Sequence, residues 1–212
     1  MTDVSREALH AVFGADAFAL PLFYGTQPAL RFELSLGGTM LDQFEQAWDR
    51  GREIVDHALG DARELIVVIS AFADGPRMPY RDVFRSLRAL RVRMGRPRAW
   101  WTEPFHDPHV DGPDTLAYVA FACGREAVRP LLWGALAAWL NVEPRLVGNL
   151  YVASVERGIV LQPYDDRGMD AAGPNRALLA ELYHRFNDRL LDYDRDRMRA
   201  FFEPAHDVQV PG

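Results

Sequence analysis

The most regular hydrophobic pattern of the chain lies between Met40 and Leu59. Apolar residues recur there every three to four positions, which is the period of one face of a helix. Thr39 and Asp42 approximate a capping box at the start, and Gly60 follows the last apolar position. The pattern therefore predicts an amphipathic helix over 40–59.

Other stretches also have helical spacing. Ser5 is a suitable N-cap for a helix ending at Phe13, and Pro130 suits the first turn of a helix that buries apolar residues up to Leu140. Residues 80–90 are compatible with a further helix between two breaker segments. After Asn175, an apolar stripe continues to about 202, so we expect one long C-terminal helix there.

Strand patterns lie between these segments. Residues 30–36 alternate strictly between apolar and polar, as one buried face and one solvent face require, and 65–70 is a continuous apolar run typical of a central strand. Further strands are expected at 18–24, 98–102, 115–122, 149–155 and 159–163. The sequence predicts a single α+β domain over 1–212, with a mostly antiparallel sheet, helices packed on it and a long C-terminal helix.

Composition narrows the class of protein. The 212 residues are 49% hydrophobic, which suits one domain, and a formal net charge of −6 argues against a dedicated nucleic-acid binder. The only cysteine, Cys123, excludes an internal disulfide and makes a cysteine-built zinc site unexpected. The N-terminus does not resemble a signal peptide, and the uncharged stretch 130–142 is too short to span a bilayer. We expect a soluble, cytoplasmic protein that binds neither nucleic acid nor membrane.

A histidine- and aspartate-rich stretch is the first candidate for a metal site. His106, Asp107, His109 and Asp111 offer nitrogen and oxygen ligands within six residues. No second ligand pair is apparent elsewhere, and a polar loop explains the same composition. We favour the loop and expect no bound metal.

Catalytic candidates are few. His184 and Asp188 would share one face of the predicted C-terminal helix, either as an acid–base couple or, as we favour, as a surface contact. Cys123 is either a nucleophile or, as we favour, a buried and inert thiol. The chain has no phosphate-binding glycine loop, nucleophile elbow or zinc-protease motif. We therefore expect no catalytic residue and no cofactor.

Acidic residues and arginines concentrate near the C-terminus. The turn Tyr164-Asp-Asp-Arg-Gly168 follows a predicted strand, and 186–198 continues the same composition on the predicted helix. The paired aspartates suit a divalent metal, whereas carboxylate–guanidinium bonds that dock the helix suit the arginines, and we favour the second interpretation. The candidate binding or structural cluster comprises Asp165, Asp166, Arg167, Asp188, Asp192, Asp194 and Arg195.

These same residues carry a family resemblance. The stretches 159–168 and 182–195 resemble the C-terminal signature of a bacterial domain-of-unknown-function family, in which a Tyr-Asp-Asp-Arg-Gly turn precedes a helix with an Asp-Tyr-Asp-Arg motif. Arg189 stands where that pattern often has tryptophan, so no role of that aromatic is carried over. The resemblance implies no activity. The compact acidic α+β character is also similar to that of small immunity proteins that neutralise bacterial toxins.

These observations favour a non-catalytic module that binds another protein, with toxin immunity as the specific form. An acidic surface would attract a basic, nuclease-like toxin through electrostatic steering. The alternative is a metal-dependent enzyme that uses Asp165 and Asp166, and a third hypothesis is a structural or assembly component. The sequence leaves the oligomeric state and the identity of the partner open.

Overall fold

The protein folds around one seven-stranded sheet. The computed structural model describes residues 3–73, 79–105, 114–140, 142–165 and 167–203. The sheet order is β1-β7-β6-β5-β2-β4-β3, and each pairing between these strands is antiparallel. The strands are β1 (Ala29–Glu33), β2 (Leu65–Phe72), β3 (Arg98–Phe105), β4 (Asp114–Cys123), β5 (Asn149–Ser154), β6 (Ile159–Pro163) and β7 (Gly168–Ala172).

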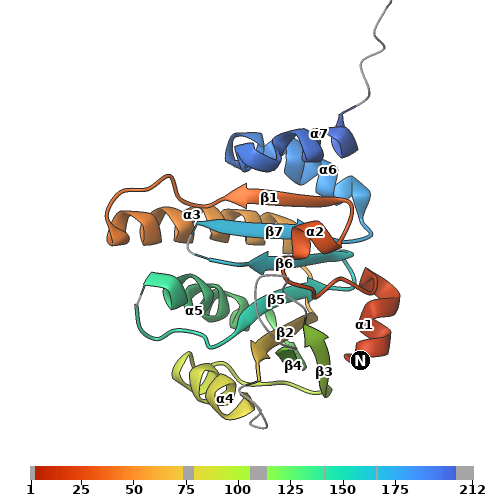
Figure 1. Ribbon diagram of the computed structural model, residues 1–212, viewed down its shortest axis with the longest axis vertical. Helices are drawn as coiled ribbons and strands as arrows, with labels where there is room; N and C mark the ends of the chain where they lie inside the picture. The colour runs from red at the N-terminus through yellow and green to blue at the C-terminus, as the bar shows by residue number, and fades with distance from the viewer. Residues whose placement is uncertain (1–2, 74–78, 106–113, 141, 166, 204–212) are drawn as a thin grey trace, which may run out of the picture.

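Helices cover both faces of this sheet and one of its edges (Figure 1). They are α1 (Arg6–Phe13), α2 (Leu22–Gly25), α3 (Met40–Leu59), α4 (Tyr80–Ala89), α5 (Val128–Leu140), α6 (Arg176–Arg185) and α7 (Arg195–Phe202). The two C-terminal helices, α6 and α7, lie beside β1 at the edge of the sheet (Figure 1). The predicted α+β class, with helices packed on an antiparallel sheet, is confirmed.

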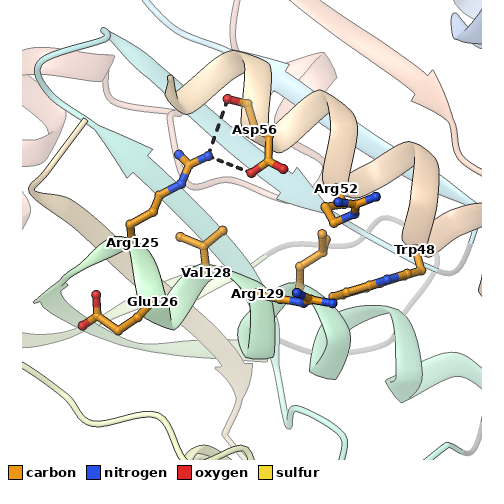
Figure 2. Close-up of a pocket in the computed structure, with 8 residues that line it drawn as sticks. Trp48, Arg52, Asp56, Arg125, Glu126, Val128 and Arg129 are labelled. Atoms are coloured by element: carbon orange, nitrogen blue, oxygen red, sulfur yellow. Dashed lines mark hydrogen bonds and ion pairs between the residues drawn. The ribbon is translucent and has the colours of Figure 1, made fainter. Parts of the chain in front are cut away.

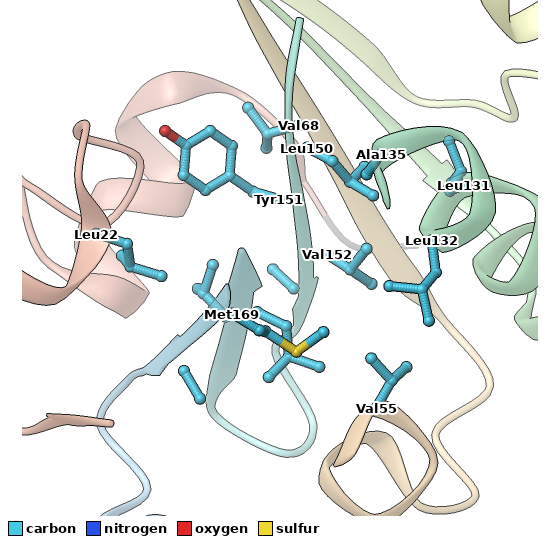
Figure 3. Packing of buried hydrophobic residues seen from close by; sticks show 14 of the residues in the cluster. Leu22, Val55, Val68, Leu131, Leu132, Ala135, Leu150, Tyr151, Val152 and Met169 are labelled. Atoms are coloured by element: carbon cyan, nitrogen blue, oxygen red, sulfur yellow. The ribbon is translucent and has the colours of Figure 1, made fainter. Parts of the chain in front are cut away.

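Successive residues of the central strands point to opposite layers. On β5, Tyr151 lies on the side of Leu22 in α2, whereas Val152 lies on the side of Leu132 in α5 and Val55 in α3 (Figure 3). Because both faces are covered, the strands are apolar on both sides, as in β2, whose first seven residues are all buried. In the described part of the chain, no helix combines the length and the apolar composition that crossing a membrane would require.

Several elements lie where the local sequence pattern predicts them. Helix α3 occupies the predicted 40–59, and the capping box is complete because Thr39 and Asp42 bond each other's backbone N–H groups. Ser5 caps α1 as expected. The strand predicted at 65–70 lies inside the sheet between β5 and β4. The strand predicted at 30–36 is shorter, since β1 ends at Glu33.

The segment 18–24 is not a strand. It forms a turn followed by α2, with Pro21 at the N-cap position. The backbone N–H of Leu22 donates to the Gln162 side chain, and that of Phe23 donates to Asp170. Side chains of β6 and β7 therefore take the hydrogen bonds that a sheet ladder would otherwise provide.

The prediction of one long C-terminal helix is also wrong. Helix α6 ends at Arg185, and two short 3-10 turns (187–189 and 192–194) separate it from α7. Leu190 leaves the helical path to pair with Phe32 of β1, so tertiary contacts with the sheet edge override helical continuity. The predicted stripe of α5 needs a further correction, because Trp139 points outward and is 66% exposed.

Candidate functional site

The turn between β6 and β7 is a compact, locally closed structure. The Asp165 carboxylate accepts the N–H of Arg167 at 2.7 Å, and the N–H of Tyr164 donates to the carbonyl of Gly168 at 3.1 Å. A Cβ atom at Gly168 would overlap the Tyr164 ring, which explains the glycine at this position. Asp166 lies outside the described residues.

Arg167 does not dock the C-terminal segment through its side chain. That side chain is 70% exposed, and among the described residues its ion-pair partner is Asp165 of the same turn, at 3.6 Å. Among the described residues, Arg167 therefore forms none of the carboxylate–guanidinium bonds that were expected to dock the C-terminal helix. The turn is instead joined to the end of β1, because the Arg167 carbonyl accepts the N–H of Leu34 at 2.6 Å.

Arg195 organises the segment between α6 and α7. Its guanidinium donates to the carbonyls of Asn187 (3.1 Å) and Leu190 (3.2 Å) and pairs with Asp192 at 2.8 Å. These bonds hold together the backbone where the helix is interrupted, and they give the Leu190 carbonyl a donor. Asp188 lies 4.0 Å from Arg189, measured between the charged atoms.

Arg189 ties this segment to α3. Its guanidinium lies over the Phe186 ring at 5.2 Å and pairs with Glu53 of α3 at 2.7 Å. The position where the family pattern often has tryptophan thus contacts an aromatic ring and a carboxylate in this chain.

Arg31 connects the C-terminal segment to the sheet. It lies on β1, and its guanidinium forms two bonds with Asp170 of β7, at 2.8 Å from Nε and 3.0 Å from Nη2. Its Nη1 lies 3.5 Å from the carboxylate of Asp194. Arg31 is only 8% exposed and Asp170 is fully buried. The strict alternation of 30–36 had placed Arg31 on a solvent face, and the structure corrects that interpretation.

Aromatic rings enclose this ion pair. The Arg31 guanidinium lies 4.8–4.9 Å from the ring centroids of Phe23, Tyr24 and Tyr164. The Tyr24 hydroxyl donates to Asp194 at 3.1 Å. Burial lowers the pKa of Arg31, but its hydrogen bonds to Asp170 outweigh this and raise that pKa above its ordinary value. Burial raises the pKa of Asp170 against the opposing effect of Arg31. We call Arg31, Asp170, Asp194 and the three rings the Arg31 cluster. It is a charged part of the core.

The β6–β7 turn and the C-terminal segment both contact Arg31, although Asp194 is the one member of the predicted cluster that the structure places against it among the described residues. Tyr164, from the turn, and Asp194, from the C-terminal segment, both contact Arg31. Neither Arg31 nor Asp170 was among the candidates. The sequence offers no signal that identifies Arg31, because the alternation over 30–36 assigns its position to the solvent face and its burial is known only from the structure.

The other chemical candidates are a metal site, Cys123 and the His184/Asp188 pair. Among the described residues, no group of three or more His, Cys, Asp or Glu side chains is placed to hold a metal ion. The stretch 106–111 lies outside the described residues. Burial, and secondarily Glu126, raises the pKa of Cys123 to about 12, which opposes thiolate formation. His184 is exposed on the last turn of α6, and Asp188 lies beyond the end of that helix.

A groove lies between α3 and α5. It contains a cavity of about 350 Å³, whose lining residues are Trp48, Arg52, Asp56, Arg125, Glu126, Val128, Arg129 and Leu132. Figure 2 shows Arg125, in the 3-10 turn just before α5, reaching Asp56 on α3, where the ion pair measures 2.8 Å, and Trp48 lying beside Arg129. A second cavity of about 340 Å³ shares Trp48 and Arg129 and is also lined by Pro130 and Trp133. We call both cavities together the α3/α5 groove.

Aromatic side chains form the wall of this groove. Trp133 packs edge-on against Phe44 and Trp48, with ring centroids 4.6 and 5.5 Å apart. The exposed Arg129 guanidinium lies 5.4 Å from the Trp48 ring. The groove thus presents flat apolar surface next to a guanidinium that has solvent access. The sequence analysis missed it, because Trp48 and Trp133 belong to helices that are separate in sequence.

Comparison with known proteins gives a family assignment. No curated protein and no solved structure matches the chain. One family model, described as Domain of unknown function (DUF3885), matches residues 6–194, a range that contains the β6–β7 turn, Arg31 and Asp194. The suspected relationship to a domain-of-unknown-function family is confirmed, and the chain belongs to the DUF3885 family.

Proposed function

We propose that the protein is a non-catalytic module that binds another protein through the α3/α5 groove. The observation that carries this proposal is the combination of Trp48, Trp133 and Arg129 around two cavities that share Trp48 and Arg129. Tryptophan and arginine are the residue types that dominate the energetic centres of protein interfaces, since they combine a large contact area with directional polar groups.

The charged residues that line the α3/α5 groove indicate the chemistry of the partner segment that would bind there. Arg129 has no carboxylate partner among the described residues, and the guanidinium of Arg52 lies 4.0 Å from Asp49, at the limit of an ion pair. A carboxylate on the partner would pair with these guanidinium groups, and a neighbouring apolar side chain would fill the space between Trp48 and Trp133. The proposed occupant is therefore a segment with an acidic residue next to a large apolar residue.

Toxin immunity is the specific form of this proposal. It rests on the similarity in size, acidity and fold class to small immunity proteins, and it implies a cytoplasmic protein whose partner is a toxin. A toxin gene directly beside the gene for this chain, and co-purification of the two products, would support this form. The groove favours an acidic binding segment on the toxin, whatever the overall charge of that toxin.

Selection from random peptides displayed on phage tests the proposed recognition. We expect the enriched peptides to carry Asp or Glu beside an aromatic or leucine residue. We expect Arg129→Glu to abolish their binding, because the exposed guanidinium would be replaced by a carboxylate. Arg63→Glu is the matched control, since Arg63 is also exposed and lies outside the groove.

Two outcomes would contradict the proposal. One is the enrichment of peptides that lack the acidic and apolar pair. The other is binding that Arg129→Glu and Arg63→Glu weaken equally, which would indicate a general charge effect.

A further inference from the structure

Arginines concentrate in one short segment of this acidic chain. Residues 81–98 contain seven of the 24 basic residues and only one of the 30 acidic residues, Asp82. The segment therefore carries a formal charge of +6, while the rest of the chain carries −12. Such segregation concentrates positive potential at one location and attracts anions there.

The fold places part of this segment around another cavity, separate from the α3/α5 groove. After α4, the chain turns back into β3, and the space between them measures about 880 Å³. The residues that line it are Phe84, Leu87, Arg88, Arg91, Val92, Arg93, Met94 and Arg98. No carboxylate is among them. We call this space the arginine pocket.

The guanidinium groups of the arginine pocket are mostly uncommitted. Arg98 donates to the carbonyls of Gly95 and Met94, which fixes its position at the start of β3. Arg88, Arg91 and Arg93 are exposed, and none of them has a side-chain hydrogen bond or ion pair with another described residue. Three guanidinium groups with free donors thus surround a space whose apolar lining comes from α4 and the following loop.

The backbone at Arg91 argues against a purely structural explanation. Basic residues in the last turn of a helix interact favourably with the helix dipole, and this accounts for Arg88. Arg91, however, has φ +59°, in the left-handed region, just after α4 ends. The N–H of Val92 bonds the carbonyl of Leu87 across this residue, in the helix-terminating turn that normally places glycine there. An arginine at this position is less stable than glycine, so its presence suggests a role for the side chain.

We propose that the arginine pocket binds an organic di- or triphosphate. Guanidinium groups pair bidentately with phosphate oxygens, and several are needed to neutralise two or three phosphates. The half-buried Phe84 and Met94 provide an apolar surface for the organic part. Extended nucleic acid fits less well, because the −12 charge of the remaining chain would repel a polyanion that reaches beyond the pocket.

Calorimetric titration with ADP and with pyrophosphate tests this site. We expect both to bind the wild type, with ADP tighter because its organic part contacts Phe84 and Met94. The double variant Arg88→Ala/Arg93→Ala should weaken both affinities about a hundredfold, since each charged hydrogen-bonding group contributes about tenfold. Arg81→Ala/Arg85→Ala is the matched control, because it removes the same amount of charge nearby, from residues of α4 that do not line the pocket.

The variant Arg91→Gly distinguishes the effect of Arg91 on ligand binding from its effect on the stability of the fold. We expect its melting temperature to equal or exceed that of the wild type, while its affinity for pyrophosphate falls about tenfold. Unchanged affinity in this variant would overturn the role of Arg91. Failure of ADP and pyrophosphate to bind the wild type at millimolar concentration would overturn the site. A single-stranded oligonucleotide that binds more tightly than ADP would overturn the assigned ligand class.

Discussion

The Arg31–Asp170 pair offers the most direct test of how the C-terminal segment is held. The Asp170 carboxylate accepts hydrogen bonds from Arg31 Nε, from Arg31 Nη2 and from the backbone N–H of Phe23, at 2.8, 3.0 and 3.0 Å. Asp170→Ala removes all three acceptor contacts at once. It leaves the guanidinium of Arg31 in a site where that residue is only 8% exposed.

The expected magnitude follows from this geometry. Removing one partner of a buried ion pair costs about 3–5 kcal/mol, because the other charge remains buried without compensation. Asp194 stays 3.5 Å from Arg31 and offsets part of this cost, while the lost acceptor of the Phe23 N–H adds about 1–3 kcal/mol. We expect Asp170→Ala to lower the free energy of unfolding by about 4 kcal/mol, a large share of the 5–15 kcal/mol typical of a domain.

Urea unfolding, followed by tryptophan fluorescence, measures this quantity. A double-mutant cycle with Arg31→Met isolates the interaction, since the double variant removes both charges and should cost clearly less than the two single variants combined. Asp82→Ala is the control, because Asp82 pairs with Arg85 on an exposed surface, where such pairs are worth about 0–1 kcal/mol. A cost below about 1 kcal/mol for Asp170→Ala, or strict additivity in the cycle, would refute the reasoning.

Four further outcomes follow from the structure. Burial raises the pKa of Cys123 to about 12, so alkylation at pH 8.5 should be at least about a hundredfold slower in the native protein than in urea. Burial, aided by Arg6, lowers the pKa of His10, so the melting temperature should fall as the pH drops below about 6.5, and His10→Gln should reduce that fall. Trp139→Ala should change the free energy of unfolding by less than about 1 kcal/mol, as urea titration would show, because the side chain is 66% exposed. Arg195→Ala should lower the melting temperature clearly, through the freed carbonyls, whereas Arg167→Ala should not.

Elements specified by local interactions could be predicted from the sequence. Helix α3 has both its start, at Thr39 and Asp42, and its end, at Gly60, encoded within a few residues of the helix itself. The apolar run of β2 similarly encodes its burial on both faces. In each case, the residues that decide the structure are adjacent in sequence.

Elements specified by distant contacts could not be predicted. Strand β7 reads Gly-Met-Asp-Ala-Ala, without alternation or branched residues, and it is a strand because β1 and β6 pair with its two edges. Asp170 lies 139 positions from Arg31, so the ion pair is invisible until the sheet order is known. The same holds for the α3/α5 groove, which joins Trp48 to residues more than eighty positions later.

The residues of the C-terminal signature attach the C-terminal segment to the sheet in this structure. Tyr164, after β6, and Asp194, before α7, contact the same guanidinium, and Gly168 makes room for the Tyr164 ring. The surfaces that are open to a ligand, the α3/α5 groove and the arginine pocket, lie on other elements. A sequence signature that stabilises the fold identifies relatives without identifying what they bind. Members of this family should therefore share the Arg31 cluster while differing in the residues that line the two pockets, and their ligands should differ accordingly.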